Sequence, residues 1–199
     1  MSTAVPLNLL TALPAEAKPL IALLGLKRNP RQHPFPVYNA PGISLAISGV
    51  GIRAMHEASR YLLDHSSTEQ TSAWLNIGIC GHGSLALGES LIAQRVIRGD
   101  QATWDLLVPP GLTQQAGTLC CVEQPQADYR PGMAYDMESA GFMTALQSEL
   151  RRGRIGLLKV VSDNPYHGSD RITAQGVREL IAQQAAFITD MIDWLTRND

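Results

Sequence analysis

Apolar residues along this chain fall into short runs that alternate with segments of helical spacing. Leu7–Leu13 is an apolar run interrupted at Pro14, and Ala15–Leu24 then places its apolar residues on one helical face. This pattern predicts a buried strand followed by a helix, with Pro14 in the first helical turn, where no N–H is needed. Ile43–Ile47 and Ile52–Asp64 repeat the pattern. Strands that alternate with helices indicate an α/β fold.

The later part of the chain continues in the same way. The further strands that we expect are Trp74–Ile77, Ser90–Ile97, Thr118–Val122 and Ile155–Val161, and the further helices are Asp136–Leu150 and Thr173–Leu195. Residues 29–41 hold four prolines, which predicts a loop with a short edge strand. Residues 99–132 show no clear pattern outside the strand named above. We predict a mixed, mostly parallel sheet flanked by helices, in a single domain that spans residues 1–199.

Composition and charge narrow the class of protein. The chain has 199 residues, of which 45% are hydrophobic and 17% charged, so it can bury a sizeable core. The net charge is −2 and no basic block is present, which argues against nucleic acid or an anionic membrane as a partner. A small-molecule partner fits this small negative net charge better.

The three cysteines and the first apolar run bear on the compartment. Cys80, Cys120 and Cys121 lack the spacing of a zinc site or a redox pair, so we expect reduced thiols, no metal and a cytoplasmic protein. No positive charge precedes the run at Val5–Leu13, which favours a core strand over a signal peptide. No apolar run approaches the length of a bilayer span.

Four polar or glycine-rich segments follow predicted strands. They are Pro14–Glu16, Ser48–Gly51, Gly78–Gly83 and Ser162–Asp170. In open α/β sheets, ligands bind outside the carboxyl ends of the strands. We therefore expect these segments to converge on one site at that edge of the sheet.

Carboxylates dominate the candidate chemistry. Asp136-Met137-Glu138 places two acids around a thioether, and Glu16 and Asp163 follow strands elsewhere. A carboxylate can accept sugar hydroxyls in charge-assisted hydrogen bonds, and a thioether is a soft surface for a ribose ring. Cleavage of an N-glycosidic bond needs a proton for the base, negative charge near the cationic sugar and an incoming nucleophile. Carboxylates in different protonation states can meet these demands without a metal or cofactor.

The ordered set of motifs gives a more specific indication. It consists of Thr11–Ala17, Ser48–Gly51, the Gly78–Gly83 segment, Asp136-Met137-Glu138 and Val161-Ser162-Asp163. In this order the chain resembles the nucleoside phosphorylase and nucleosidase superfamily, which includes the methylthioadenosine/S-adenosylhomocysteine nucleosidases. The Asp-Met-Glu-Ser-Ala sequence is also similar to the hopanoid-associated phosphorylase-like proteins. The resemblance implies a phosphorylase/hydrolase-like fold, here shortened between residues 100 and 133.

The resemblance also implies roles for individual residues. Glu138 would bind the ribose 2′- and 3′-hydroxyls, and Met137 would pack on the ribose. Asp163 would protonate a purine-type leaving group, oriented with the help of Ser162. Glu16 would hold and activate water.

Further positions follow from the same resemblance. Gly78, Cys80 and Gly81 lie in the segment that would bind the base. Arg53 is the best remaining contact for an anion, although it could equally be an exposed helix residue. Proteins of this kind commonly form homo-oligomers in which a neighbour closes the pocket, and we expect the same here.

The sequence favours hydrolysis over phosphorolysis. Ile79 stands where the phosphorylases have a serine, and Asn76 stands where they have an arginine. Each lost phosphate contact removes about 1.5–3 kcal/mol of binding. Two alternatives stay open: a phosphorylase with an unusual phosphate site, and a nucleoside-binding relative without activity.

Simpler interpretations exist for each acid. Glu16 could only complement a helix dipole. Asp136 and Glu138 could begin an exposed helix, and Asp163 could cap the turn before Pro165. The base specificity is open, because Glu123–Gln126 occupies the place of residues that would stack on an adenine.

Overall fold

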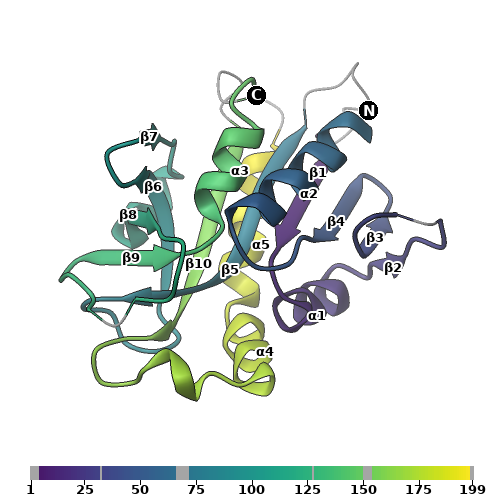
Figure 1. Ribbon diagram of the computed structural model, residues 1–199. Helices are drawn as coiled ribbons and strands as arrows, with labels where there is room; N and C mark the ends of the chain where they lie inside the picture. Colours follow the sequence, from purple (N-terminus) through teal and green to yellow (C-terminus); the bar gives the residue numbers. More distant parts are fainter. Residues whose placement is uncertain (1–4, 32, 66–71, 127, 150–153, 198–199) are drawn as a thin grey trace.

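The computed structural model describes residues 5–31, 33–65, 72–126, 128–149 and 154–197 (Figure 1). In chain order, the elements are β1 (Leu7–Thr11), α1 (Pro14–Leu23), β2 (Lys27–Arg28), β3 (Val37–Ala40), β4 (Ile43–Ile47), α2 (Ile52–His65), β5 (Ala73–His82), β6 (Ser90–Arg98), β7 (Ala102–Asp105), the 3-10 helix η1 (Pro110–Gln115), β8 (Ala116–Cys121), β9 (Met133–Asp136), α3 (Ser139–Ala145), β10 (Ile155–Asp163), the 3-10 helix η3 (Ser169–Arg171), α4 (Ala174–Gln183) and α5 (Ala185–Thr196). The alternation of strands and helices predicted from the sequence is confirmed.

The centre of the sheet is parallel. β1 lies between β4 and β5, and β5 also pairs with β10, all in the same direction. β3 and β2 extend one side in antiparallel fashion. The carboxyl ends of β1, β4, β5 and β10 therefore meet at one edge, as the sequence predicts.

The sheet is mixed, as predicted, but the expectation that it is a simple, mostly parallel sheet was wrong. β10 pairs antiparallel with β6, β6 pairs with β8, β8 with β9, and β9 runs antiparallel to the end of β5. Because β5 also pairs with β10, these strands close on themselves into a mixed barrel. Figure 1 shows β6, β8 and β9 curving away from β5 and β10 on the side opposite β2, β3 and β4.

The length of β5 explains this closure. The sequence predicts a strand over Trp74–Ile77 and a loop over Gly78–Gly83, but the strand continues through His82. Its last residues pair with β9, Gly81 opposite Tyr135 and His82 opposite Ala134. The extra length lets one strand hold β10 along its course and β9 at its end.

Helices cover the sheet on two faces, and alternate residues of each strand feed two cores. Leu10 of β1 packs in the cluster that contains Met55 of α2 and Phe142 of α3. Its neighbour Leu9 packs in the other cluster, which α1, α4 and α5 complete. This alternation is the period-two pattern of a strand buried on both faces.

Two helix predictions need correction. Asp136 ends a strand, and the helix predicted over Asp136–Leu150 begins only at Ser139; Leu150 lies outside the described residues. The closing helix consists of α4 and α5, with Gln184 between them. Within the described part of the chain, no helix combines the length and apolar character that crossing a bilayer requires.

Candidate functional site

A cavity of about 310 Å³ lies at the edge where the central strands end. Its wall includes the side chains of Glu16, Met137, Glu138, Ser162 and Asp163. The structure therefore brings together, from three separate parts of the chain, the acids and their neighbours that the sequence places in one site. Cys80 and Gly81 also line this cavity.

A wider hollow of about 540 Å³ lies at the start of α2, and Arg53 lines it. The Arg53 side chain is 91% exposed and pairs with Glu57 at 2.7 Å, and it does not line the cavity that holds the carboxylates. The structure does not bring the predicted anion contact into the site. We place the candidate site in the smaller cavity, because buried acids converge only there among the described residues.

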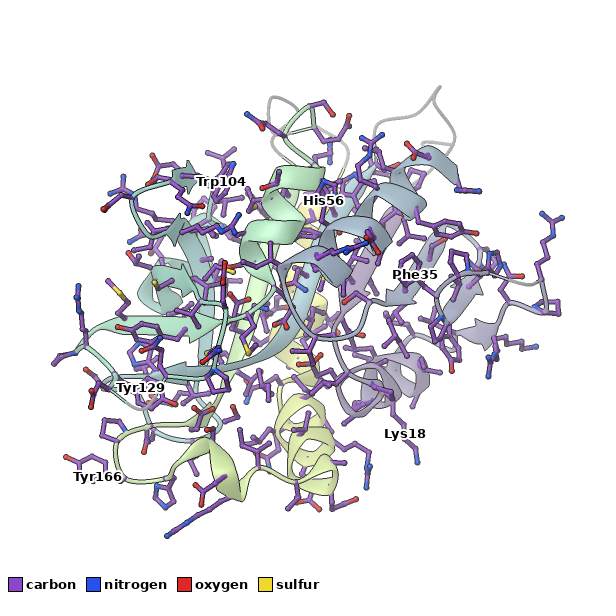
Figure 2. The ribbon with its side chains drawn as sticks, viewed as in Figure 1. Lys18, Phe35, His56, Trp104, Tyr129 and Tyr166 are labelled. Atoms are coloured by element: carbon purple, nitrogen blue, oxygen red, sulfur yellow. The ribbon has the colours of Figure 1, made fainter. Side chains whose placement is uncertain are left out.

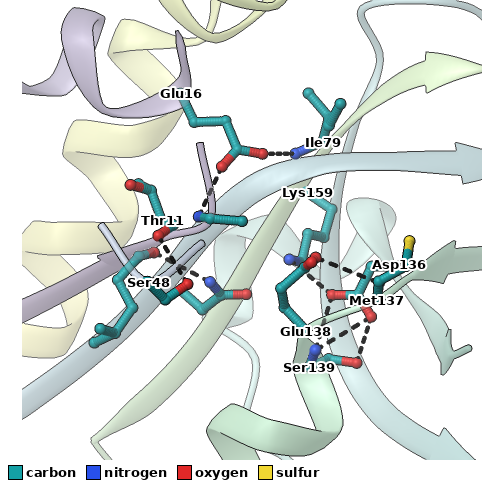
Figure 3. A network of polar contacts seen from close by, with 12 residues as sticks. Thr11, Glu16, Ser48, Ile79, Asp136, Met137, Glu138, Ser139 and Lys159 are labelled. Carbon is teal, nitrogen blue, oxygen red and sulfur yellow. Dashed lines mark hydrogen bonds and ion pairs between the residues drawn. The ribbon is translucent and has the colours of Figure 1, made fainter. Parts of the chain in front are cut away.

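Glu16 is fixed by three backbone N–H groups. It is the third residue of α1 and only 2% exposed. Its Oε2 accepts from Ala12 (2.9 Å) and Leu13 (2.8 Å), and its Oε1 accepts from Ile79 of β5 (3.0 Å) (Figure 3). Glu16 therefore closes the start of its own helix and also connects α1 to the end of the central strand.

Gly78 makes this arrangement possible. A Cβ atom at Gly78 would lie 2.9 Å from Glu16 Oε1 and 3.3 Å from Lys159 Nζ. These two side chains thus occupy the space above the glycine. Gly78 leaves room for the Glu16 and Lys159 side chains, whereas the sequence placed it in the segment that would bind the base.

Lys159 is the centre of the polar network, and the sequence analysis had not identified it. Its Nζ lies 2.8 Å from Asp136 Oδ2, and the two side chains are 1% and 0% exposed. Asp136 also accepts from the backbone N–H of Ser139 at 3.0 Å and from its hydroxyl at 2.6 Å. Asp136 is therefore a structural partner of the lysine, and it does not begin an exposed helix.

Glu138 lies beside this ion pair at the start of α3. Its Oε1 accepts the backbone N–H of Gly51 at 2.8 Å, across the turn between β4 and α2. Glu138 lines the cavity together with Met137 and Val50. The Ser48–Gly51 segment thus reaches the site through its backbone.

The charges of this network are unbalanced, because one ammonium group faces three carboxylates. Burial and the nearby Asp136 raise the pKa of Glu138 to about 7, against the opposing effect of Lys159. Burial also raises the pKa of Glu16, although Lys159 and the three N–H donors lower it. Burial alone would lower the pKa of Lys159, but Asp136, Glu138 and Glu16 hold it above its ordinary value. Lys159 therefore stays charged.

Asp163 occupies the far end of the cavity and is 5% exposed. Its Oδ1 accepts the Ser162 hydroxyl at 2.5 Å, and its Oδ2 accepts the Tyr129 hydroxyl. The turn before Pro165 is held instead by Asn164, whose Oδ1 accepts the backbone N–H of Tyr166 at 3.0 Å. The capping role considered for Asp163 thus belongs to Asn164.

Cys80 is an unreactive part of this wall. It is 3% exposed, and burial raises the pKa of its thiol far above the ordinary value, an effect that Lys159 only partly offsets. A buried thiol of this kind is a poor nucleophile.

Neither the known protein-family models nor the curated protein sequences match this chain.

Solved structures, in contrast, match the whole fold. The 5′-methylthioadenosine nucleosidase of Arabidopsis thaliana, in apo form, has a TM-score of 0.79 at 16% identity over 100% of this chain and 98% of that one. The 5′-methylthioadenosine/S-adenosylhomocysteine nucleosidase of Helicobacter pylori, with butyl-thio-DADMe-Immucillin-A, scores 0.75 at 13% identity over 97% and 100%. Futalosine hydrolase from Helicobacter pylori scores 0.73 at 14% identity over 96% and 98%. The chain therefore has the fold of these nucleosidases, which confirms the predicted resemblance at the level of structure.

Proposed function

We propose that this protein hydrolyses the N-glycosidic bond of a purine nucleoside or a nucleoside-like compound. The observation that carries the proposal is the convergence of Glu16, Glu138 and Asp163 on one cavity. The fold shared with a methylthioadenosine nucleosidase and with futalosine hydrolase supports it, since the first is named for cleavage of a nucleoside and the second for hydrolysis. We assign the chain to the nucleoside phosphorylase and nucleosidase superfamily, which its sequence resembles.

In this mechanism, Asp163 acts on the base and Glu138 on the sugar. Asp163 donates a proton to a ring nitrogen of the base while the bond from that base to the anomeric carbon breaks. Glu138 accepts hydrogen bonds from the ribose hydroxyls, and its negative charge stabilises the cationic sugar. Met137 supplies the apolar contact with the ribose ring.

Glu16 has the capacity to activate water. A carboxylate offers about four lone-pair positions, and the backbone N–H groups of Ala12, Leu13 and Ile79 use three of them. The remaining position, on Oε1, is available to a water proton. Because burial raises the pKa of Glu16, it is a stronger proton acceptor than an exposed carboxylate. Water oxygen then bonds to the anomeric carbon, and its proton passes to Glu16.

The same contacts disfavour phosphate as the nucleophile. The Ile79 N–H could otherwise bind an anion, but it donates its hydrogen bond to Glu16 Oε1 at 3.0 Å. Lys159 is already paired with Asp136 at 2.8 Å, and Arg53 is paired with Glu57 outside the cavity. A phosphate at this place would meet the charge of Glu16 without a free cation among these residues to offset it.

Activity on a panel of purine and thio-nucleosides, with products identified by mass, tests the proposal. Asp163→Asn keeps the shape of the side chain but removes the acid, so turnover should fall about 10²- to 10⁴-fold. Asp190→Asn makes the same change at an exposed position of α5 and should leave turnover unchanged. Full activity in Asp163→Asn would exclude Asp163 as the acid. Nucleoside binding without turnover in the wild type would instead indicate a binding protein.

A further inference from the structure

Tyr129 belongs to the segment between β8 and β9, which the sequence left unassigned. Its ring is half-buried in the wall of the cavity and lies 5.7 Å from the ring of Tyr135, centroid to centroid. The following residue, Arg130, donates its backbone N–H to the Tyr135 hydroxyl at 3.2 Å. Contacts with Tyr135 of β9 thus hold this segment, and Tyr129 with it, in the wall of the cavity.

The Tyr129 hydroxyl is bonded to the carboxylate of Asp163, the group that contacts the leaving base in the proposed mechanism. It donates to Asp163 Oδ2, while Ser162 donates to Oδ1 at 2.5 Å. A Cβ atom at Gly81 would lie 2.5 Å from a ring carbon of Tyr129 and 2.7 Å from Asp163 Oδ2. The end of the phenol ring, the acid and the Gly81 backbone therefore meet at one point, so the phenol stands directly against the carboxylate that would contact the base.

We propose that Tyr129 is a positioning residue that holds Asp163 in the unoccupied site and is displaced when the base binds. This inference rests on the proposed function, because it assumes that Asp163 contacts the base. A base nitrogen can approach Oδ2 only after the phenol hydroxyl has left it. Burial and the bond to Asp163 raise the pKa of Tyr129, so the phenol remains a hydrogen-bond donor until it is displaced.

The displacement opposes binding, since a hydrogen bond to a carboxylate must break first. Removal of the hydroxyl should therefore tighten the binding of the base, whereas loss of a direct substrate contact would weaken it. Tighter binding of the base after the hydroxyl is removed would therefore indicate a positioning residue, and weaker binding a direct substrate contact. A half-buried ring with two rotatable bonds can leave the acid without unfolding the strands around it.

The test compares wild-type protein with Tyr129→Phe, using a nucleoside that the wild type cleaves and the free base released from it. The inhibition constant of the free base and the KM of the nucleoside should both fall about tenfold in Tyr129→Phe, with kcat retained. Tyr129→Leu, which also removes the hydroxyl, should shift the inhibition constant in the same direction. Tyr166→Phe removes a hydroxyl from a ring that is 86% exposed outside this cavity, and should change neither constant (Figure 2).

An unchanged or raised inhibition constant in both folded Tyr129 variants would overturn this inference and leave the proposed hydrolysis intact. An absence of turnover in the wild type, across the panel of nucleosides, would overturn the proposed function and this inference together.

Discussion

The Lys159 ammonium lies 2.8 Å from Asp136 Oδ2, in an ion pair whose side chains are 1% and 0% exposed. The pair links β10 to the end of β9, the strand that precedes it in the chain. The same ammonium also faces Glu138 and Glu16. A single buried cation therefore faces three of the acids that line the cavity.

Replacement of Lys159 by Met should destabilise the fold in a pH-dependent way. The change leaves buried carboxylates without a counter-charge, which removes about 3–5 kcal/mol from the free energy of unfolding at pH 7.5. The loss should be smaller at pH 5, because Glu138, with a pKa raised to about 7, is then protonated. Urea unfolding at the two pH values measures both effects. Lys18→Met, at an exposed position of α1, is the control. An equal loss at both pH values would contradict this account of the charges.

The pKa of Glu138 predicts a pH dependence of stability. A carboxyl group whose pKa is raised on folding from 4.5 to about 7 stabilises the fold below pH 4.5, and this contribution disappears as the pH rises through 7. Relative to Glu138→Gln, the wild type should therefore lose up to about 3 kcal/mol between pH 4.5 and pH 8. The difference in free energy of unfolding between the two proteins, measured across this range, gives the value. A difference that does not change with pH would show that Glu138 has an ordinary pKa.

Gly78→Ala should damage the site more than the fold. Its Cβ would lie 2.9 Å from Glu16 Oε1, so the acid must move away from Ile79. A displacement of this size in a catalytic group lowers kcat on the order of 100-fold. Gly111→Ala serves as the matched control, because a Cβ there meets no atom within 4 Å. Equal activity of the two variants would mean that the position of Glu16 is not critical for turnover.

Glu16→Gln should separate binding from hydrolysis. The amide has one acceptor oxygen and one donor group, so one of the three N–H groups now bound by Glu16 loses its partner. We expect a destabilisation of about 1–3 kcal/mol and a loss of turnover, with nucleoside binding retained. Calorimetric titration alongside the activity assay distinguishes these effects. Retained turnover would remove Glu16 from the reaction.

The sequence predicted the central strands and the acids because their signals are local. An apolar run such as Ile43–Ile47 identifies a buried strand, and the order of strand ends places Glu16 and Asp163 at one edge. The closed barrel could not be predicted in this way. It depends on the pairing of the end of β5 with β9, where Gly81 lies opposite Tyr135, and such glycines are typical of loops in a sequence.

Lys159 and Tyr129 are site residues that were not predicted from the sequence, for two different reasons. Lys159 had a signal, since it is a lysine within the otherwise apolar run Ile155–Val161, and a charge buried in a strand needs a partner. Tyr129 had no comparable signal, because its contact with Asp163 bridges residues 34 positions apart from a segment without regular spacing. The position of Arg53 was likewise a matter of tertiary geometry, since helical spacing alone does not say which way the start of α2 points.

The most direct test of the central claim is the identity of the sugar product, measured by mass with and without phosphate on the nucleoside that the wild type cleaves best. Occupation of the Ile79 N–H by Glu16 predicts free base and free ribose, at a rate that phosphate does not change. Ribose 1-phosphate, formed only when phosphate is present, would contradict the account and identify the protein as a phosphorylase.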